Sequence, residues 1–169
     1  MNLYHNSGVS EHLSPGAGTM SKVETICTFS LDNLFLGIAV GDVHEILLAQ
    51  PLTPVPLGHP FVAGLMNVRG QIVVVVDLRL VLNLPPRAES APAPVNIIVR
   101  SSHGLVSLLV DQVGGVMEVD SRVFAPPEAS PTETQKFFRG AYQLPKQLLL
   151  IFDTLGAMDL IVSQVTTRP

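Results

Sequence analysis

Three aspartates at the ends of aliphatic runs are the first candidates for chemistry in this sequence. Asp77 ends the run VVVVD, Asp111 ends SLLVD and Asp153 ends LLIFD. Paired carboxyl groups that differ in pKa can carry out hydrolysis, so a small hydrolase using these residues is one hypothesis. The alternative is that each carboxylate accepts backbone N–H groups where a strand turns. We favour this alternative, because the rest of the sequence supplies no catalytic motif.

The other reactive residue types do not form a recognisable centre either. Asp42-Val43-His44-Glu45 groups possible metal ligands but lacks the second histidine that a zinc-binding helix places one turn further on. Ser101-Ser102-His103-Gly104 is most simply a tight turn, because adjacent residues there rarely face one another and no GxSxG elbow is present. Cys27 lies in the alternating run TICTFS and is expected to be a small strand side chain. We therefore predict no enzyme, no metal and no cofactor.

Composition narrows the class of protein. The 169 residues suit one domain or two small barrels that share a core. Hydrophobic residues make up 47% and charged residues 14%, so apolar surface is left over for partners. The net charge of −4 and the lack of a Lys/Arg cluster argue against nucleic-acid binding. With no signal peptide and no apolar run long enough to insert into a membrane, we expect a reduced, soluble, cytoplasmic protein.

The elements that position these residues centre on the stretch 61–79. Two β-rich runs flank Asn67-Val68-Arg69-Gly70, and an Asn-containing, Gly-terminated turn of this kind predicts a β-hairpin. The five consecutive aliphatic residues of Ile72–Val76 predict a strand buried on both faces. Arg69 is the only charge between Phe61 and Asp77. An arginine on a stiff turn, pointing outward, suits recognition of another molecule.

The rest of the chain also predicts mainly strands. Period-two alternation or aliphatic runs mark further strands at 24–31, 34–40, 95–100, 105–110, 113–119 and 147–152. The spacing of Val43, Ile46 and Leu47 fits either a short helical turn or an irregular strand. Asp77 is the predicted N-cap of a short helix that ends before Pro85-Pro86.

Segments rich in proline, glycine and alanine set the predicted boundaries. Residues 1–22 are expected to be a flexible tail, in which His5, His12 and Tyr4 fit no ligand spacing. Four prolines make 51–60 an extended connector. The linker 85–94 is the best candidate for the place where two halves of a domain 23–160 meet, and 161–169 is assigned as a C-terminal tail.

The order of these motifs closely resembles the CheW-like domain of bacterial chemotaxis coupling proteins. The likeness spans 23–160 and is carried by VHEI at 43–46, FVAG at 61–64, NVRGQIV at 67–73, VDLR at 76–79, LVDQV at 109–113, and a segment from FRG at 138–140 to Phe152-Asp153. It implies a mainly β fold of two intertwined five-stranded SH3-like barrels with a few short helices. Leu36 and Val74 depart from an aromatic residue and a proline that the family often has there, which leaves the exact partner open.

The resemblance also implies a non-catalytic adaptor with two protein partners. These are the regulatory domain of a CheA-type histidine kinase and the cytoplasmic tip of methyl-accepting chemoreceptors, which would recruit the protein to membrane-associated receptor arrays. The receptor-binding residues that it implies are Val43, Glu45, Ile46 and Arg69, to which we add the turn residue Asn67. Val43 and Ile46 are expected to supply an apolar groove. The kinase-binding residues that we expect are Leu52, Val55 and Gly64.

Two alternatives remain open at this point. A CheW-like adaptor could serve a chemosensory pathway that controls pilus motility or development instead of flagella, and the sequence does not separate these outputs. A small hydrolase using Asp77, Asp111 or Asp153 is the remote alternative, which would require the carboxyl groups to converge in one pocket.

Overall fold

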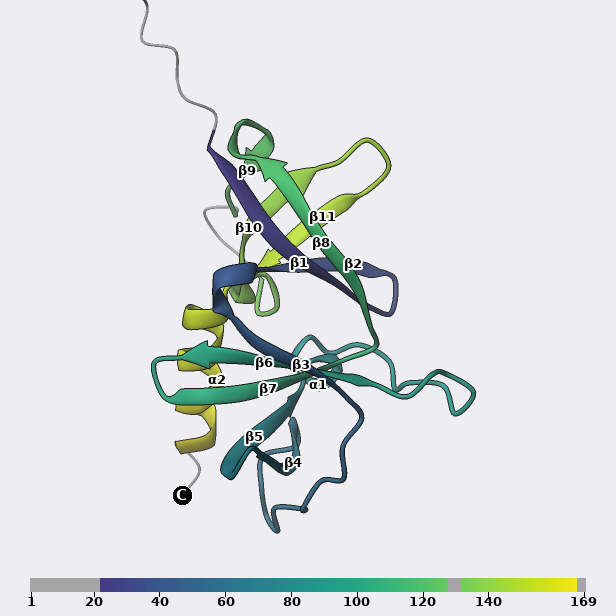
Figure 1. Ribbon diagram of the computed structural model, residues 1–169, viewed down its shortest axis with the longest axis vertical. Helices are drawn as coiled ribbons and strands as arrows, with labels where there is room; N and C mark the ends of the chain where they lie inside the picture. Colours follow the sequence, from purple (N-terminus) through teal and green to yellow (C-terminus); the bar gives the residue numbers. More distant parts are fainter. Residues whose placement is uncertain (1–21, 128–131, 167–169) are drawn as a thin grey trace, which may run out of the picture.

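Two β-sheets make up most of the computed structural model, which describes residues 22–127 and 132–166 (Figure 1). The six-stranded sheet has the order β8-β1-β2-β11-β10-β9. Its strands are β1 (Val23–Leu31), β2 (Leu34–Ala39), β8 (Gln112–Asp120), β9 (Phe124–Ala125), β10 (Phe138–Gln143) and β11 (Leu148–Phe152). The five-stranded sheet has the order β3-β6-β7-β5-β4. Its strands are β3 (Val43–Leu48), β4 (Val62–Val68), β5 (Gln71–Asp77), β6 (Val95–Ser101) and β7 (Gly104–Val110).

The helices are few and mostly short, so the predicted mainly β fold class is confirmed; the two sheets correspond to the two predicted barrels, although one has six strands instead of the predicted five. The α-helices are α1 (Leu78–Val81) and α2 (Thr154–Thr166), and the 3-10 turns are η1 (Val40–Asp42), η2 (Ser121–Val123) and η3 (Gln135–Phe137). The short helix is capped as predicted, because the Asp77 side chain accepts a hydrogen bond from the Arg79 backbone N–H. Within the described ranges, no helix is long and apolar enough to cross a membrane.

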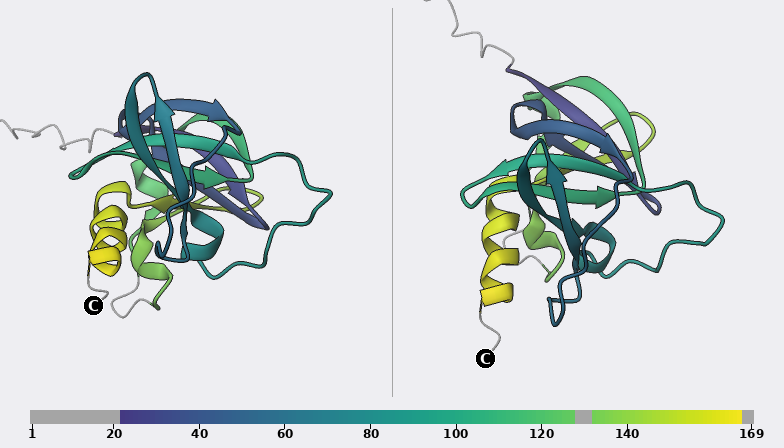
Figure 2. Two further views of the ribbon diagram at one scale, coloured as in Figure 1. Left: turned by 90° about the horizontal axis from the view of Figure 1, so that it is seen from below. Right: turned by 60° about the horizontal axis from the view of Figure 1, so that its bottom comes forward.

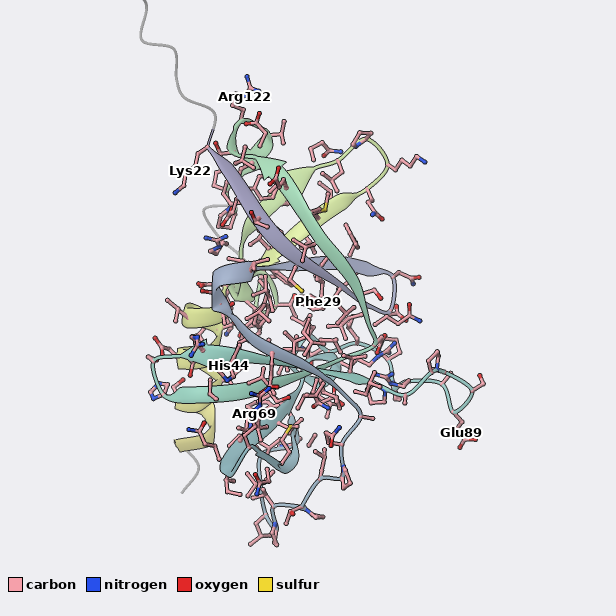
Figure 3. All side chains as sticks on the ribbon, viewed as in Figure 1. Lys22, Phe29, His44, Arg69, Glu89 and Arg122 are labelled. Atoms are coloured by element: carbon pink, nitrogen blue, oxygen red, sulfur yellow. The ribbon has the colours of Figure 1, made fainter. Side chains whose placement is uncertain are left out.

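The chain passes between the sheets at places other than the predicted boundary. It forms β1 and β2, crosses to build all five strands of the second sheet, and returns for β8 to β11. The linker 85–94 joins α1 to β6 within the five-stranded sheet, so the prediction that the two halves meet there is wrong. The linker is instead a loop that projects from the body, with Glu89 far out on it (Figure 3). A Pro/Ala-rich loop inside one sheet has the same composition as a domain boundary.

One core unites the two sheets. Its main cluster includes Phe29 and Leu36 from the six-stranded sheet, Leu108 from the five-stranded sheet and Met158 from α2, all buried. Helix α2 packs alongside the five-stranded sheet, as both views of Figure 2 show. Ile161 is buried in this core. The boundary that we predicted at residue 160 therefore falls inside a helix, which continues to Thr166.

The predicted hairpin is present as β4 and β5. Val68 pairs with Gln71, so the loop has two residues, and φ is positive at both Arg69 (51°) and Gly70 (88°). Positive φ at both positions is the type I′ geometry, which matches the natural twist of the two strands. The prediction that 72–76 is buried on both faces is wrong, because Ile72 is 67% exposed. That face of β5 borders an open apolar groove instead of a second core layer.

The proline-containing connector closes the five-stranded sheet into a barrel. β3 and β4 stand at opposite ends of the strand order. After β3 the chain returns to β4, where Thr53 and Leu65 exchange two backbone hydrogen bonds of 2.8 Å each. This contact depends on Gly64, where φ is +152° and a Cβ atom would lie only 2.8 Å from the Thr53 carbonyl oxygen. A glycine is therefore required for the connector to approach the strand.

Candidate functional site

The strand-end aspartates serve as structural acceptors. Asp77 Oδ1 accepts the Arg79 backbone N–H at 2.8 Å, and Asp153 Oδ1 accepts that of Gly156 at 3.2 Å. Asp111 Oδ2 accepts the Asp32 backbone N–H at 2.8 Å. The hypothesis that these carboxylates accept backbone N–H groups is confirmed for all three.

Asp111 also holds two arginines. Arg79 Nη2 lies 2.6 Å from Asp111 Oδ2, and Arg87 Nη2 lies 2.8 Å from Asp111 Oδ1. Burial raises the pKa of Asp111, but hydrogen bonds from Arg79 and Asp32 and the nearby charge of Arg87 outweigh it and hold that pKa below its ordinary value. The carboxylate is thus occupied by a backbone N–H and two guanidinium groups, which is a structural role and gives the hydrolase alternative no support.

The remaining reactive residues do not assemble a centre. Ser102 Oγ donates to Asp159 Oδ1 at 2.6 Å, and His103 Nε2 lies 3.1 Å from the same oxygen. The turn therefore fastens itself to helix α2, and the serine and histidine do not pair with each other. Cys27 is buried in β1, where burial raises the pKa of its thiol. His5, His12 and Tyr4, together with the rest of the predicted tail up to residue 21, lie outside the described residues. Across the described ranges, no three His, Cys, Asp or Glu side chains are placed to hold a metal ion.

Three segments meet at one end of the five-stranded sheet. β5 and β7 pair in parallel with Val74 opposite Val106, so the turns that precede the two strands lie at the same end. β3 and β6 pair antiparallel with Val43 opposite Val99, so the start of β3 lies beside the end of β6. The β4–β5 turn, the β6–β7 turn and the beginning of β3 thus form a common surface, which we call the recognition end.

Arg69 stands at the tip of this recognition end. Its side chain is 82% exposed, and Nη2 donates to Glu45 Oε2 at 3.0 Å (Figure 3). The turn below it is braced because Asn67 Oδ1 accepts the Gly70 backbone N–H at 2.8 Å. The Glu45 side chain is only 16% exposed, and its Oε1 lies 4.0 Å from His44 Nε2. The sequence prediction of an outward arginine on a stiff turn is confirmed, and Glu45 orients it.

Val43 and Ile46 do not form the apolar groove that we expected. Val43 packs against the main core, whereas Ile46 is 41% exposed and, with the more exposed Leu48, lies on the outer face of β3. Val43 and Ile46 are three positions apart in strand β3, so their side chains lie on opposite faces, as the regular alternation of burial along the strand shows. Only Ile46 offers apolar surface to a partner.

The expected kinase-binding residues lie along the connector and its neighbouring strand. Leu52 packs against the cluster that contains Met66, and Val55 is exposed. Gly64 is buried, so it acts by letting the connector approach β4 and presents no surface of its own. Val55 borders an apolar groove of about 400 Å³ that runs between β5 and α2, with Ile72 on its other side.

A second cavity, of about 620 Å³, opens at the recognition end. Its lining residues come from all three segments of that end and are His44, Val68, Arg69, Gln71, Arg100, Ser101, Gly104 and Leu105. Sequence reasoning missed His44 and Arg100 as site residues. The only signal for Arg100 was its charge in a mostly aliphatic strand, and that charge points to a site only once the pairing of β5 with β7 is known.

A family model, curated relatives and a solved structure all connect this chain to the same family. The family model described as "CheW-like domain" matches residues 25–161. "Chemotaxis protein CheW" of Bacillus subtilis is 29% identical over 142 residues, which cover 83% of this chain and 90% of that protein. The protein of the same name from Thermotoga maritima is 25% identical over 143 residues, covering 85% and 90%. The crystal structure of the scaffolding protein TtCheW from Thermoanaerobacter tengcongensis superposes with a TM-score of 0.73 at 28% identity, covering 79% of this chain and 91% of that one.

Proposed function

Because the chain belongs to the CheW-like domain family, we propose that it is a non-catalytic adaptor that couples chemoreceptors to a CheA-type histidine kinase. The family and the named relatives support a role as a chemotaxis scaffold. The coupling of a receptor to a kinase, and recruitment to receptor arrays at the membrane, are the finer parts of the proposal.

The observation that carries the proposal is the way in which Arg69 is presented. The guanidinium is exposed and donates to Glu45, while the type I′ turn and the hydrogen bond from Gly70 to Asn67 fix the backbone beneath it. Such a group loses little side-chain entropy on binding, and its planar fork suits carboxylates or carbonyl oxygens of a partner. Val43, Glu45, Ile46 and Asn67 belong to this receptor surface, Val43 by supporting β3 from within.

The kinase surface that we propose lies around the connector. Val55 is exposed there, and Leu52 and Gly64 fix the path of the connector against β4. The groove beside Val55 and the cavity beside Arg69 share Leu105 among their lining residues and otherwise have different linings. The two proposed surfaces therefore adjoin without coinciding.

The test is receptor capture by an Arg69→Glu variant. Co-sedimentation of the purified protein with chemoreceptor-containing membranes from the same genome should fall at least roughly ten-fold on charge reversal. Binding to the CheA-type kinase and the melting temperature should stay near those of the parent, because the side chain is exposed.

Arg122→Glu is the matched control. Arg122 is also exposed and also pairs with a single carboxylate, that of Asp120, but it lies at the far end of the six-stranded sheet from Arg69 (Figure 3). Reversing its charge should leave receptor capture unchanged. Equal recovery of the Arg69→Glu variant and the parent in the membrane pellet would contradict the proposed receptor surface.

A further inference from the structure

The cavity at the recognition end is a basic groove on an acidic protein. The chain carries a net charge of −4, yet the charged lining residues of this cavity are Arg69 and Arg100, and no carboxylate is among the described residues that line it. The imidazole of His44 is on the same wall. Figure 3 shows His44 and Arg69 close together at this side of the sheet.

Arg100 is the lining arginine whose guanidinium has no carboxylate partner among the described residues. It lies near the end of β6 and is exposed, and its side chain makes no hydrogen bond or ion pair with any residue of the described ranges 22–127 and 132–166. Every other arginine in those ranges is hydrogen-bonded to a carboxylate or lies in an ion pair with one: Arg69 with Glu45, Arg79 and Arg87 with Asp111, Arg122 with Asp120, and Arg139 with Glu24. An unpaired guanidinium inside a concave site, where the other charged lining residue is Arg69, is placed to receive an anion from elsewhere.

We propose that Arg100 is a second anchor for the partner and that the groove recognises an acidic segment of a chemoreceptor. The inference rests on the proposed function and names the chemistry of the same site. The segment presents two carboxylates, one to Arg69 and one to Arg100, with an apolar side chain between them. The apolar lining residues Val68 and Leu105 suit that side chain.

A protein carboxylate fits this groove better than a phosphate polymer or a lipid surface. Two arginines on a protein with a net charge of −4 do not provide the several cations that nucleic acid or an anionic membrane requires. They do provide one bidentate partner for each of two carboxylates. The cavity of about 620 Å³ also has room for several side chains of a protein segment.

The experiment measures the affinity of the full chain for a soluble fragment that contains the cytoplasmic tip of a chemoreceptor from the same genome. Arg100→Glu should weaken binding roughly ten-fold, and Arg100→Gln should weaken it less and reduce its dependence on salt. A receptor fragment with one tip glutamate changed to lysine should restore binding to Arg100→Glu but not to the parent. Arg122→Glu again serves as the control. Circular dichroism should show that all variants of the chain are folded, since the side chains of Arg100 and Arg122 are exposed.

Three outcomes overturn the inference in distinguishable ways. If Arg69→Glu weakens binding while Arg100→Glu binds like the parent, Arg100 is no anchor and the proposed function stands. If the parent itself does not bind the receptor fragment, the proposed receptor coupling fails and this inference fails with it. If the parent binds receptor-free phosphatidylglycerol vesicles and Arg100→Glu does not, the groove recognises lipid phosphate and not an acidic protein segment.

Discussion

Replacing Asp111 with alanine should destabilise the junction between the two barrels. Asp111 follows β7 and precedes β8, at a point where the chain crosses from one sheet to the other. Its carboxylate joins the β1–β2 turn, helix α1 and the linker, through the Asp32 backbone N–H and the guanidinium groups of Arg79 and Arg87. The side chains of Arg79 and Asp111 are only 11% and 16% exposed, so little water is available to replace the lost contacts.

The structure allows a rough magnitude for this loss. Removing one partner of a buried ion pair costs about 3–5 kcal/mol, because the other charge is left uncompensated. Arg79 would keep its hydrogen bond to the Pro85 carbonyl and the Asp32 carboxylate at 3.8 Å, so we expect the lower end, about 3 kcal/mol. With a urea slope of about 2 kcal/mol/M, the unfolding midpoint followed by circular dichroism should fall by about 1.5 M.

An exposed ion pair and the pH dependence of stability both test this role of Asp111. Glu133→Ala removes a carboxylate that also pairs with a cation, Lys136, but is 89% exposed, and it should change stability by less than about 0.5 kcal/mol. The pKa of Asp111 is lower in the folded protein than its ordinary 3.8, so its contribution is complete above that pH and is lost as the pH falls through the folded-state value. For the isosteric variant Asp111→Asn, the difference from the parent in free energy of unfolding should therefore close in acid. A midpoint shift no larger than that of Glu133→Ala, or a gap that widens in acid, would refute the argument.

Two further predictions concern the connector and a buried phenol. Gly64→Ala should cost about 2 kcal/mol in thermal unfolding, because its Cβ would meet the Thr53 carbonyl oxygen at a positive φ, whereas Gly41→Ala, where a Cβ meets nothing within 4 Å, should be close to neutral. Burial, together with the hydrogen bond to Glu24, raises the pKa of Tyr142 to about 12. Ultraviolet titration should show its ionisation well above pH 10, and Tyr142→Phe should abolish that phase; an unchanged high-pH phase would contradict the assignment.

Local signals in the sequence were sufficient for the hairpin and its arginine. The Asn-Val-Arg-Gly turn and the aliphatic runs beside it predict the β4–β5 hairpin, and an isolated charge at such a tip has to face outward. The exposure of Ile72 was not predictable in the same way. An aliphatic run specifies a strand but does not show whether another layer covers its second face.

The errors at the boundaries and in the site have a related cause. Proline and alanine at 85–94 predict an irregular segment, but whether it separates sheets depends on which strands pair across it. Arg100 and Arg69 become neighbours only through the parallel pairing of β5 with β7, strands that the sequence separates by a long loop and another strand. Val43 was placed beside Ile46 because a spacing of three puts two side chains on one face of a helical turn, whereas the segment is a strand, in which the same spacing puts them on opposite faces.

β7 connects the two features on which these predictions depend. Its first residues border the basic groove, and Asp111 follows its last residue at the inter-barrel junction. The strand is paired on both sides, by β6 and by β5, so its two ends are held by separate sets of contacts. Loss of the Asp111 contacts should therefore lower the free energy of unfolding while the folded protein still binds the receptor fragment. Charge reversal at Arg100 should instead weaken binding and leave the free energy of unfolding nearly unchanged, because its exposed side chain makes no hydrogen bond or ion pair within the described residues.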